Sequence, residues 1–343
     1  NSKFKNKITI FGNTKYKKKF NLKYLNIELK KDIFSSQTKR YVNKFVQLEK
    51  KINSSIIEVH NRPSYIHILN KKSTKKVLTL YFHNDPLSMD GSKTISERKS
   101  LLKICYKIIF NSAWSKKRFL EGLENKFVNS NKLLIFYQSA SKSNISTINK
   151  KKKWITFVGK LNRAKGYDIF AKSIKKILDK NKNWKALVIG DEKREKITLK
   201  HKNAKILGFK KHNQVINIFK KTSITVACSR WEEPFGRTSL EASANGCAVI
   251  ITNKGGLPET VTDAKIMANL NTKELTKNLQ ELIDNPKKRK ELQRLSIKNF
   301  YLTHQFVTKK IDQYRAEKLD FEKRFFTKRS NISLRVLHVT NFN

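Results

Sequence analysis

The chain has 343 residues, of which 38% are hydrophobic, and its 75 Lys and Arg far outnumber its 27 Asp and Glu, giving a formal net charge of +48. This length is enough for two domains of ordinary size, and the apolar content excludes a largely disordered chain. No run of 18 apolar residues occurs in the sequence, so no transmembrane helix is expected.

Short apolar runs rich in β-branched residues alternate along the chain with segments whose apolar residues recur at helical spacing. Such runs are typical of strands buried on both faces of a parallel sheet. The first series of strands is expected at 8–11, 55–60, 76–83, 107–112 and 132–138. The second series is expected at 154–160, 185–191, 204–209, 224–229 and 247–252, with helices at 166–180, at 213–221 and beyond residue 272. The alternation predicts an α/β chain with two doubly wound sheets.

The polar stretch 139–153 has few apolar residues and precedes a new strand, so it marks the expected domain boundary. A first domain would span residues 1–150 and a second 151–300. A helix at 301–328 would then return toward the first domain. The tail 329–343 contains an apolar strand, "LRVLHV", for which this arrangement has no sheet position.

The positive charge is spread along the whole chain together with many Asn and Ile, which indicates a drift in composition rather than one binding patch. Aromatic residues do not interleave with basic ones, so no dedicated nucleic-acid binding is expected. Peripheral attraction to anionic lipid needs only the electrostatic field, and we expect it at the inner face of the membrane. The odd number of cysteines, each in an apolar run, favours a reduced cytoplasmic chain with buried thiols at Cys105, Cys228 and Cys247.

The stretch "WEEPFGRTSLEASANG" carries two glutamates, Glu233 and Glu241, on either side of a strand-turn-helix junction. The N–H groups of the first helical turn, around Gly236 to Ser239, could hold a phosphate. Glu241 could accept two hydroxyls of a ribose and Glu233 the hydroxyls of a sugar, both as charge-assisted hydrogen bonds. The alternative is a dipole partner at Glu241 and a solvated loop acid at Glu233. Spacing alone leaves both interpretations open.

A second strand-to-helix turn, "VGKLNRAKGYD", gathers Lys160, Arg163 and Lys165 where a diphosphate could bind. The abundance of lysine in this chain is the competing explanation. In "NKGGLPETV" the paired glycines would let the backbone approach a ligand, although an ordinary loop is equally consistent with the pattern.

Two histidines of the first half, His60 and His83, each end a predicted strand and would lie in a cleft, although a lone histidine is more often structural. No set of His, Cys and Asp has the spacing of metal ligands, so no metal is expected.

Taken together, these motifs resemble the retaining GT-B glycosyltransferases of family four, which use nucleotide-sugar donors. The resemblance rests on "YFHNDP", "IIFNSAWSKKRFLEGL", "FVGKLNRAKG", "EPFGRTSLEASANG" and "GGLPE", which occur in the family's order over roughly residues 55–310. The pair of glutamates followed by Gly-Gly-x-Pro-Glu is its specific part.

The resemblance implies two Rossmann-like domains facing a cleft, with the donor bound mainly by the second. Glu241 would hold the ribose and Glu233 the transferred sugar, while Lys165 would bind the diphosphate. The implied catalytic residues are His83, Glu233 and Lys165. The implied donor-binding residues are Lys160, Arg163, Lys165, Gly208, Phe209, Glu233, Phe235, Gly236, Arg237, Thr238 and Glu241.

Two departures from the family pattern affect these expectations. Lys160 stands where the family usually has Arg, which keeps the charge but loses the planar fork, so Arg163 could take over that contact. The strand and glycine-rich turn that normally open the first domain are not found, so the chain is expected to lack its N-terminal start. The tail 329–343 resembles that opening strand. It would begin a further transferase domain or, less favoured, contribute a rearranged strand to the first sheet.

The expected reaction transfers a sugar, with retention, from a nucleotide diphosphate to a glycan or lipid-linked acceptor, without metal or cofactor. A GT-B epimerase or phosphorylase would use the same fold. A non-catalytic scaffold that binds polyanions is the alternative from a different class.

Overall fold

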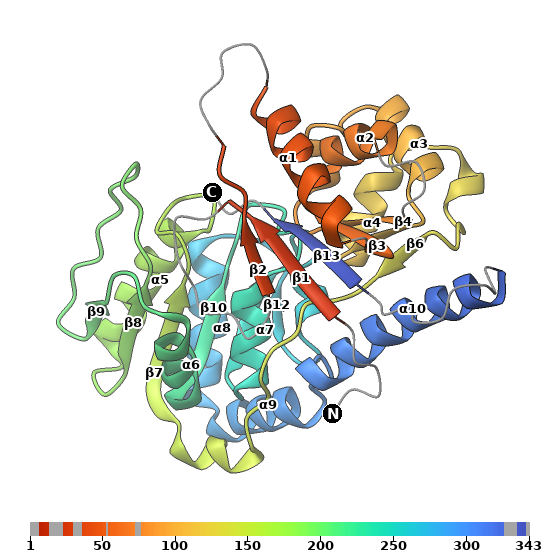
Figure 1. Ribbon diagram of the computed structural model, residues 1–343. Helices are drawn as coiled ribbons and strands as arrows, with labels where there is room; N and C mark the ends of the chain where they lie inside the picture. The colour runs from red at the N-terminus through yellow and green to blue at the C-terminus, as the bar shows by residue number, and fades with distance from the viewer. Residues whose placement is uncertain are drawn as a thin grey trace. The chain divides into compact units, whose positions relative to one another are not determined.

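The computed structural model describes residues 7–13, 23–29, 36–52, 54–72, 77–325 and 335–340 (Figure 1). The chain divides into two compact units, one of Asn1–Tyr137 with Thr308–Asn343 and one of Gln138–Val307. The polar stretch after 138 therefore lies inside the second unit, whereas the sequence placed the boundary at 150. The reason is that the short 3₁₀ helix Ile145–Lys150 (η3) packs against two helices of that unit, α6 (His212–Lys221) and α9 (Pro286–Lys298).

The first unit is built on a seven-stranded sheet in the order β2-β1-β13-β3-β4-β5-β6, in which every described pairing is parallel. Its strands are β1 (Lys7–Gly12), β2 (Lys23–Asn26), β3 (Ile56–His60), β4 (Val77–Phe82), β5 (Lys107–Phe110), β6 (Leu133–Ile135) and β13 (Arg335–Thr340). Its helices are α1 (Gln37–Ile52), α2 (Pro63–Lys72), α3 (Ile95–Ile104), α4 (Ala113–Leu120) and most of α10 (His304–Phe325).

The strand β13 has a central place in this sheet, and the expectation that it has none is wrong. It pairs in parallel with β1 on one side, Arg335 opposite Lys7, and with β3 on the other, Val336 opposite Ile56 (Figure 1). The strand order reverses at β13, which is the position of the first strand in a Rossmann sheet. The local sequence pattern could identify a strand but not partners so distant along the chain.

Helix α10 is fixed to the first sheet by buried polar contacts. Arg315 forms a two-point ion pair with Glu58 on β3, with nitrogen–oxygen distances of 2.9 and 2.6 Å. The hydroxyls of Tyr314 and Thr79, the latter on β4, are 2.5 Å apart. Burial alone would lower the pKa of Arg315, but the adjacent Glu58 carboxylate raises it above its usual range. These contacts bind a helix from the end of the chain to strands from its first quarter.

The second unit contains a six-stranded sheet in the order β12-β11-β10-β7-β8-β9, again parallel throughout its described pairings. Its strands are β7 (Lys152–Val158), β8 (Lys185–Ile189), β9 (Ala204–Ile206), β10 (Thr222–Ala227), β11 (Ala248–Thr252) and β12 (Lys265–Met267). Its helices are α5 (Tyr167–Lys180), α6 (His212–Lys221), α7 (Arg237–Ala244), α8 (Thr272–Asp284) and α9 (Pro286–Lys298). This is the Rossmann strand order, with the reversal between β7 and β10.

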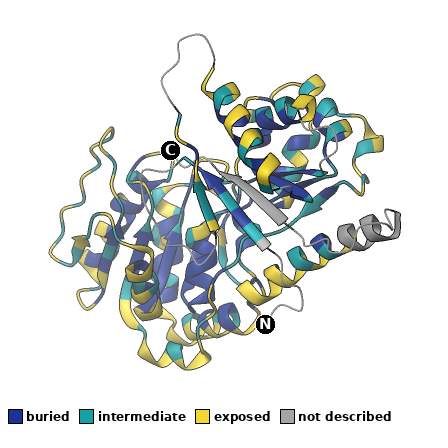
Figure 2. Ribbon diagram, in the orientation of Figure 1, coloured by how far each residue is buried: buried dark blue, intermediate teal, exposed yellow. Residues whose placement is uncertain are grey.

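The apolar runs form the cores of both units, as the sequence predicted. All five residues of β11 are buried, and so are all of β10 except Ala227. Figure 2 shows this burial concentrated in the strands, while the outer helix faces are exposed. The three cysteines are buried and unpaired, which confirms the prediction of buried thiols. Among the described helices, none combines the length and apolarity needed to cross a membrane.

Candidate functional site

The strand order of the second sheet reverses between β7 and β10, so the loops at their carboxyl ends border the crevice where α/β sheets bind ligands. The loop after β7 carries Lys165, and the loop after β10 carries Glu233. The Lys165 ammonium donates a hydrogen bond to Oε1 of Glu233. Two of the predicted site residues, 68 positions apart in the sequence, are therefore an ion pair.

The N-terminus of α7 forms a second side of this site. Gly236 caps the helix with a φ of 110°, and a Cβ there would come within 2.5 Å of the Leu257 side chain, so the close approach needs glycine. Thr238 donates its hydroxyl to the carbonyl of Val158, which ties the first turn of α7 to the end of β7. The N–H groups of that turn could hold an anion beside Lys165.

These elements enclose a cavity of about 240 Å³. It is lined by Phe157, Val158, Gly159, Lys165, Ala227, Ser229, Glu233, Gly236, Arg237, Thr238 and Leu257. Five of the residues predicted from the sequence, Lys165, Glu233, Gly236, Arg237 and Thr238, thus line one cavity.

The carboxylates of the two predicted glutamates are largely shielded from solvent. The Glu233 side chain is 13% exposed and that of Glu241 is 8% exposed. Oε1 of Glu241 accepts from the Arg237 guanidinium at 2.5 Å and lies 3.1 Å from Nε2 of His212. The alternative of a solvated loop acid at Glu233 is therefore wrong. A shielded carboxylate with cationic partners can accept hydroxyl groups in a fixed direction.

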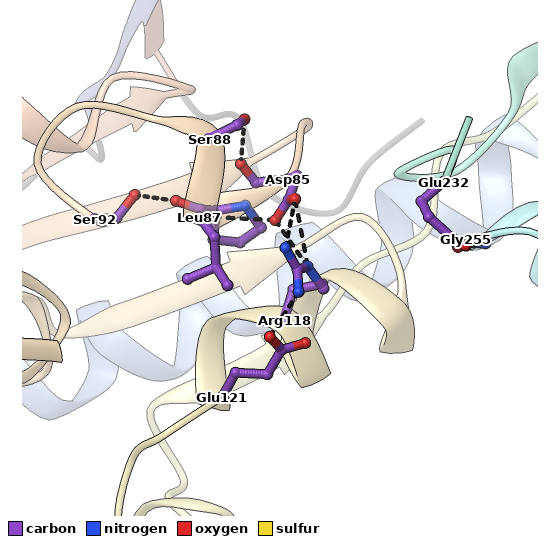
Figure 3. Close-up of polar contacts among 9 residues, drawn as sticks. Asp85, Leu87, Ser88, Ser92, Arg118, Glu121, Glu232 and Gly255 are labelled. Atoms are coloured by element: carbon purple, nitrogen blue, oxygen red, sulfur yellow. Dashed lines mark hydrogen bonds and ion pairs between the residues drawn. The ribbon is translucent and has the colours of Figure 1, made fainter. Parts of the chain in front are cut away.

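The loop that carries Glu233 is held from both sides. Arg230 forms a two-point ion pair with Asp168 of α5, at 2.6 and 2.7 Å, and this hydrogen bonding holds the pKa of Asp168 below its usual range. On the other side, the Gly255 N–H donates to the Glu232 carboxylate at 2.5 Å (Figure 3). The Gly256 N–H donates to the backbone carbonyl of Glu233 at 2.6 Å. The paired glycines therefore hold in place the loop that carries Glu233.

The remaining predicted donor residues lie outside that cavity lining. Lys160 and Arg163 are exposed residues of the loop after β7. Gly208 and Phe209 follow β9, where the Phe209 ring is 76% exposed. The Phe235 side chain is buried in the core, so the predicted donor contact would have to be made by its backbone.

The first unit holds a pair of histidines at the carboxyl ends of adjacent strands, His60 on β3 and His83 after β4. Nδ1 of His60 lies 3.0 Å from Nε2 of His83, and their rings are stacked. The His60 ring also stacks on Tyr81, whose hydroxyl donates to Glu58 at 3.3 Å. The pKa of Tyr81 is raised, first by burial and then by the Glu58 charge. His83 therefore belongs to a connected polar cluster that the sequence did not predict.

The loop after His83 is fixed by Asp85 (Figure 3). The Asp85 carboxylate caps the following turn by accepting from the Leu87 N–H at 3.0 Å and pairs with Arg118 of α4 at 3.1 Å. Arg118 also donates to Glu121 at 2.6 Å. Asn61 has a backbone φ of 60°. Its side-chain oxygen accepts a hydrogen bond from the backbone N–H of His83 at 3.0 Å. These bonds hold the loop around His83 from the end of β3 and from α4.

Residues 138–298, most of the second unit, match the family described as Glycosyl transferases group 1. Over these residues the chain is similar to the group 1 glycosyltransferases. Its fold is GT-B: the crystal structure of Anabaena Alr3699/HepE in complex with UDP-glucose superposes with a TM-score of 0.63, covering 82% of each chain at 18% identity. At that identity the likeness establishes the fold alone.

Curated relatives of this glycosyltransferase are matched over differing lengths. Spore coat protein SA of Bacillus subtilis is 24% identical over 277 residues, which are 72% of this chain and 74% of that protein. The lipopolysaccharide core biosynthesis mannosyltransferase LpsB of Rhizobium meliloti is 31% identical over 121 residues, 32% of this chain and 34% of its own. Two further relatives, from Bacillus subtilis and Klebsiella pneumoniae, are covered over 57% of their own length.

Sequence reasoning missed one residue of the glycosyltransferase's second unit that contacts a predicted site residue. His212 begins α6 and meets Glu241, but it lies 29 positions earlier in the chain. Neither its spacing nor its lysine-rich surroundings mark it as a site residue. The available signal was its position at the start of α6, a helix that follows a strand of the same parallel sheet as the predicted site.

Proposed function

We propose that this glycosyltransferase moves a sugar from a nucleotide-diphosphate donor to an acceptor hydroxyl, with retention of anomeric configuration. The observation that carries the proposal is the single cavity shared by Lys165, Glu233 and the first turn of α7. A cation and a helix N-terminus suit a diphosphate, and a shielded carboxylate suits the hydroxyls of a sugar. A nucleotide sugar presents both groups next to each other.

In the proposed reaction, the bond between the anomeric carbon and the diphosphate oxygen breaks. The developing charge on the leaving diphosphate would be stabilised by Lys165 and the N–H groups of α7, an electrostatic contribution fixed before the reaction starts. Glu233 would hold the sugar hydroxyls and Glu241 the ribose. Lys160 and Arg163, exposed on the loop after β7, would reach the diphosphate from outside the cavity.

For retention, the acceptor oxygen would attack from the face that the diphosphate leaves, and a phosphate oxygen would take its proton. A covalent glycosyl-enzyme intermediate is disfavoured because double displacement uses a pair of carboxyl groups, and Glu233 is the one acidic residue in the lining of the described cavity. His83 remains a proposed catalytic residue on the family resemblance. Gly208, Phe209 and the backbone of Phe235 likewise remain proposed donor contacts.

The acceptor and cell location are proposed from the relatives and the charge. The mannosyltransferase LpsB acts in lipopolysaccharide core biosynthesis, and another relative comes from a cps region, which together favour a cell-envelope glycan or lipid-linked acceptor. The complex of HepE with UDP-glucose favours a UDP-sugar donor. A net charge of +48 would attract the enzyme to anionic lipid on the cytoplasmic face of the membrane.

A thermal-shift screen with UDP-, GDP-, ADP- and CMP-sugars tests donor binding, because a ligand of the native state raises the melting temperature by mass action. We expect a shift with one diphosphate sugar and none with the CMP-sugars, which carry one phosphate. Glu241→Gln should abolish the shift, while the exposed control Glu291→Gln should keep it.

Other outcomes separate the alternatives. Turnover of the sugar nucleotide without an acceptor would indicate an epimerase, and a requirement for free phosphate would indicate a phosphorylase. A shift with heparin and with no sugar nucleotide would overturn the proposal in favour of a polyanion-binding scaffold.

A further inference from the structure

The first residues of two helices meet on one carboxylate oxygen in the second unit. His212 begins α6 and Arg237 begins α7. Oε1 of Glu241 accepts from the Arg237 guanidinium at 2.5 Å and lies 3.1 Å from Nε2 of His212. Both contacts use Oε1, and Oε2 accepts no hydrogen bond from the residues that the structure describes. The plane of the carboxylate is therefore fixed by two donors on one side.

The contact between His212 and Glu241 contributes little to stability. The imidazole is 67% exposed, whereas the carboxylate is 8% exposed. A histidine with so little packing around it adds at most a weak, solvent-screened attraction to the folded state. What the contact does determine is the direction in which the shielded carboxylate points.

The loop before His212 contains other residues of the kind that bind a nucleoside. Phe209, three residues earlier, presents a ring that is 76% exposed. Gly208 anchors the loop by accepting from the Gly190 N–H at 3.0 Å. One short segment between β9 and α6 thus supplies an aromatic surface and an imidazole, and the imidazole reaches the proposed ribose carboxylate.

We propose that His212 is a positioning residue for ribose recognition, acting through Glu241. By donating to Oε1, the imidazole orients the carboxylate so that Oε2 accepts the ribose hydroxyls. The consequence is discrimination between ribo- and 2′-deoxyribonucleotides. This inference rests on the proposed function, because it assumes that Glu241 faces the ribose of a bound nucleotide.

Calorimetric titration of the full chain with UDP, GDP and ADP, and with the 2′-deoxy form of whichever binds, tests this role. One lost hydrogen bond to a charged group should weaken binding of the 2′-deoxy form to the wild type by about tenfold. His212→Ala should reduce that difference to within about twofold, since Arg237 alone then holds Oε1 and the carboxylate can turn about that single contact. His212→Gln, which keeps an N–H donor, should restore most of it. Lys210→Ala, which removes a charge from the same exposed loop, should leave it unchanged.

A merely structural role would lower the melting temperature of His212→Ala and weaken both nucleotides equally. Full discrimination in a folded His212→Ala protein would overturn the inference while leaving the proposed function intact. Failure of the wild type to bind any of the three nucleoside diphosphates would overturn both.

Discussion

Lys165 donates a hydrogen bond to Oε1 of Glu233, so a cation from the loop after β7 and a carboxylate from the loop after β10 neutralise each other at the strand reversal of the second sheet. Both side chains line the same cavity. A diphosphate that enters it would compete with Glu233 for the ammonium. A ligand that separates this ion pair therefore loses binding free energy unless it offers one group to Lys165 and another to Glu233.

This competition predicts opposite effects for the two partners. Glu233→Gln should bind a nucleoside diphosphate as tightly as the wild type or up to about tenfold more tightly, because Lys165 is released for the phosphates. Its rate of sugar transfer should nevertheless fall by about 100-fold. Lys165→Met should weaken the same diphosphate by at least about tenfold. Titration and initial rates check this, and equal loss of binding in both variants would contradict it.

Two glycines with similar backbone angles offer a matched test of how closely Gly255 packs against the backbone of Glu233. Gly255 has a φ of 60° and Gly208 a φ of 66°. A Cβ at Gly255 would lie 2.6 Å from the Glu233 nitrogen, whereas a Cβ at Gly208 would meet no atom within 4 Å. Gly208→Ala should cost about 1 kcal/mol from its backbone angle alone. Gly255→Ala should cost about 1–3 kcal/mol more from overlap. Denaturant unfolding measures both, and equal losses would show that the loop shifts freely.

The buried ion pair between Arg315 and Glu58 predicts a large loss when one partner is removed. Arg315→Met leaves an uncompensated carboxylate inside the first unit and should reduce its stability by about 3–5 kcal/mol. Arg294→Met, which breaks an exposed pair with Glu291, should leave the stability nearly unchanged. Hydrogen exchange of peptides from β3 and α10 reports on this unit specifically. Unchanged exchange in Arg315→Met would show that α10 is held by other contacts.

The three cysteines should be inert toward thiol reagents in the folded protein. Burial raises the pKa of the Cys105 and Cys228 thiols to about 12 and also raises that of Cys247. Since the thiolate is the reactive form, labelling at pH 8 should be slow until the chain unfolds. Mass spectrometry after iodoacetamide treatment counts the modified sites, and rapid native labelling of any of the three would contradict this burial.

The pair of Arg230 and Asp168 predicts a dependence on pH with a definite sign. The hydrogen bond from Arg230 lowers the pKa of Asp168 in the folded state, so its stabilisation is present above the unfolded pKa of about 3.9 and is lost as pH falls through the folded value. Arg230→Gln should therefore be less stable than the wild type by up to about 1 kcal/mol near neutral pH. The two proteins should converge only at a pH below the lowered folded-state pKa of Asp168, where its carboxyl is protonated in both. A difference that grows with acidity would contradict this.

Local pattern was sufficient for most strands and for much of the site. The runs at 154–160 and 224–229 appear as β7 and β10, and the junctions that follow them carry Lys165 and Glu233, which the sequence proposed for one site without predicting their ion pair. The features that the sequence did not predict include contacts between residues far apart along the chain. The edge strands β2 and β12 are too short to show a period. Contacts such as His212 with Glu241 are set by sheet order, which no short window of sequence contains.

The position of β13 has a consequence for how the protein folds during synthesis. The interior strand β13, between β1 and β3 in the first sheet, comes from residues 335–340, so β1 and β3 cannot be bridged until those residues have left the ribosome. The second unit, at 138–307, is translated completely before then and can fold on its own contacts. Closing the first sheet spans nearly the whole chain, which predicts a slow final step. Until then, β1 and β3 present open edges that chaperones or other nascent chains could pair with.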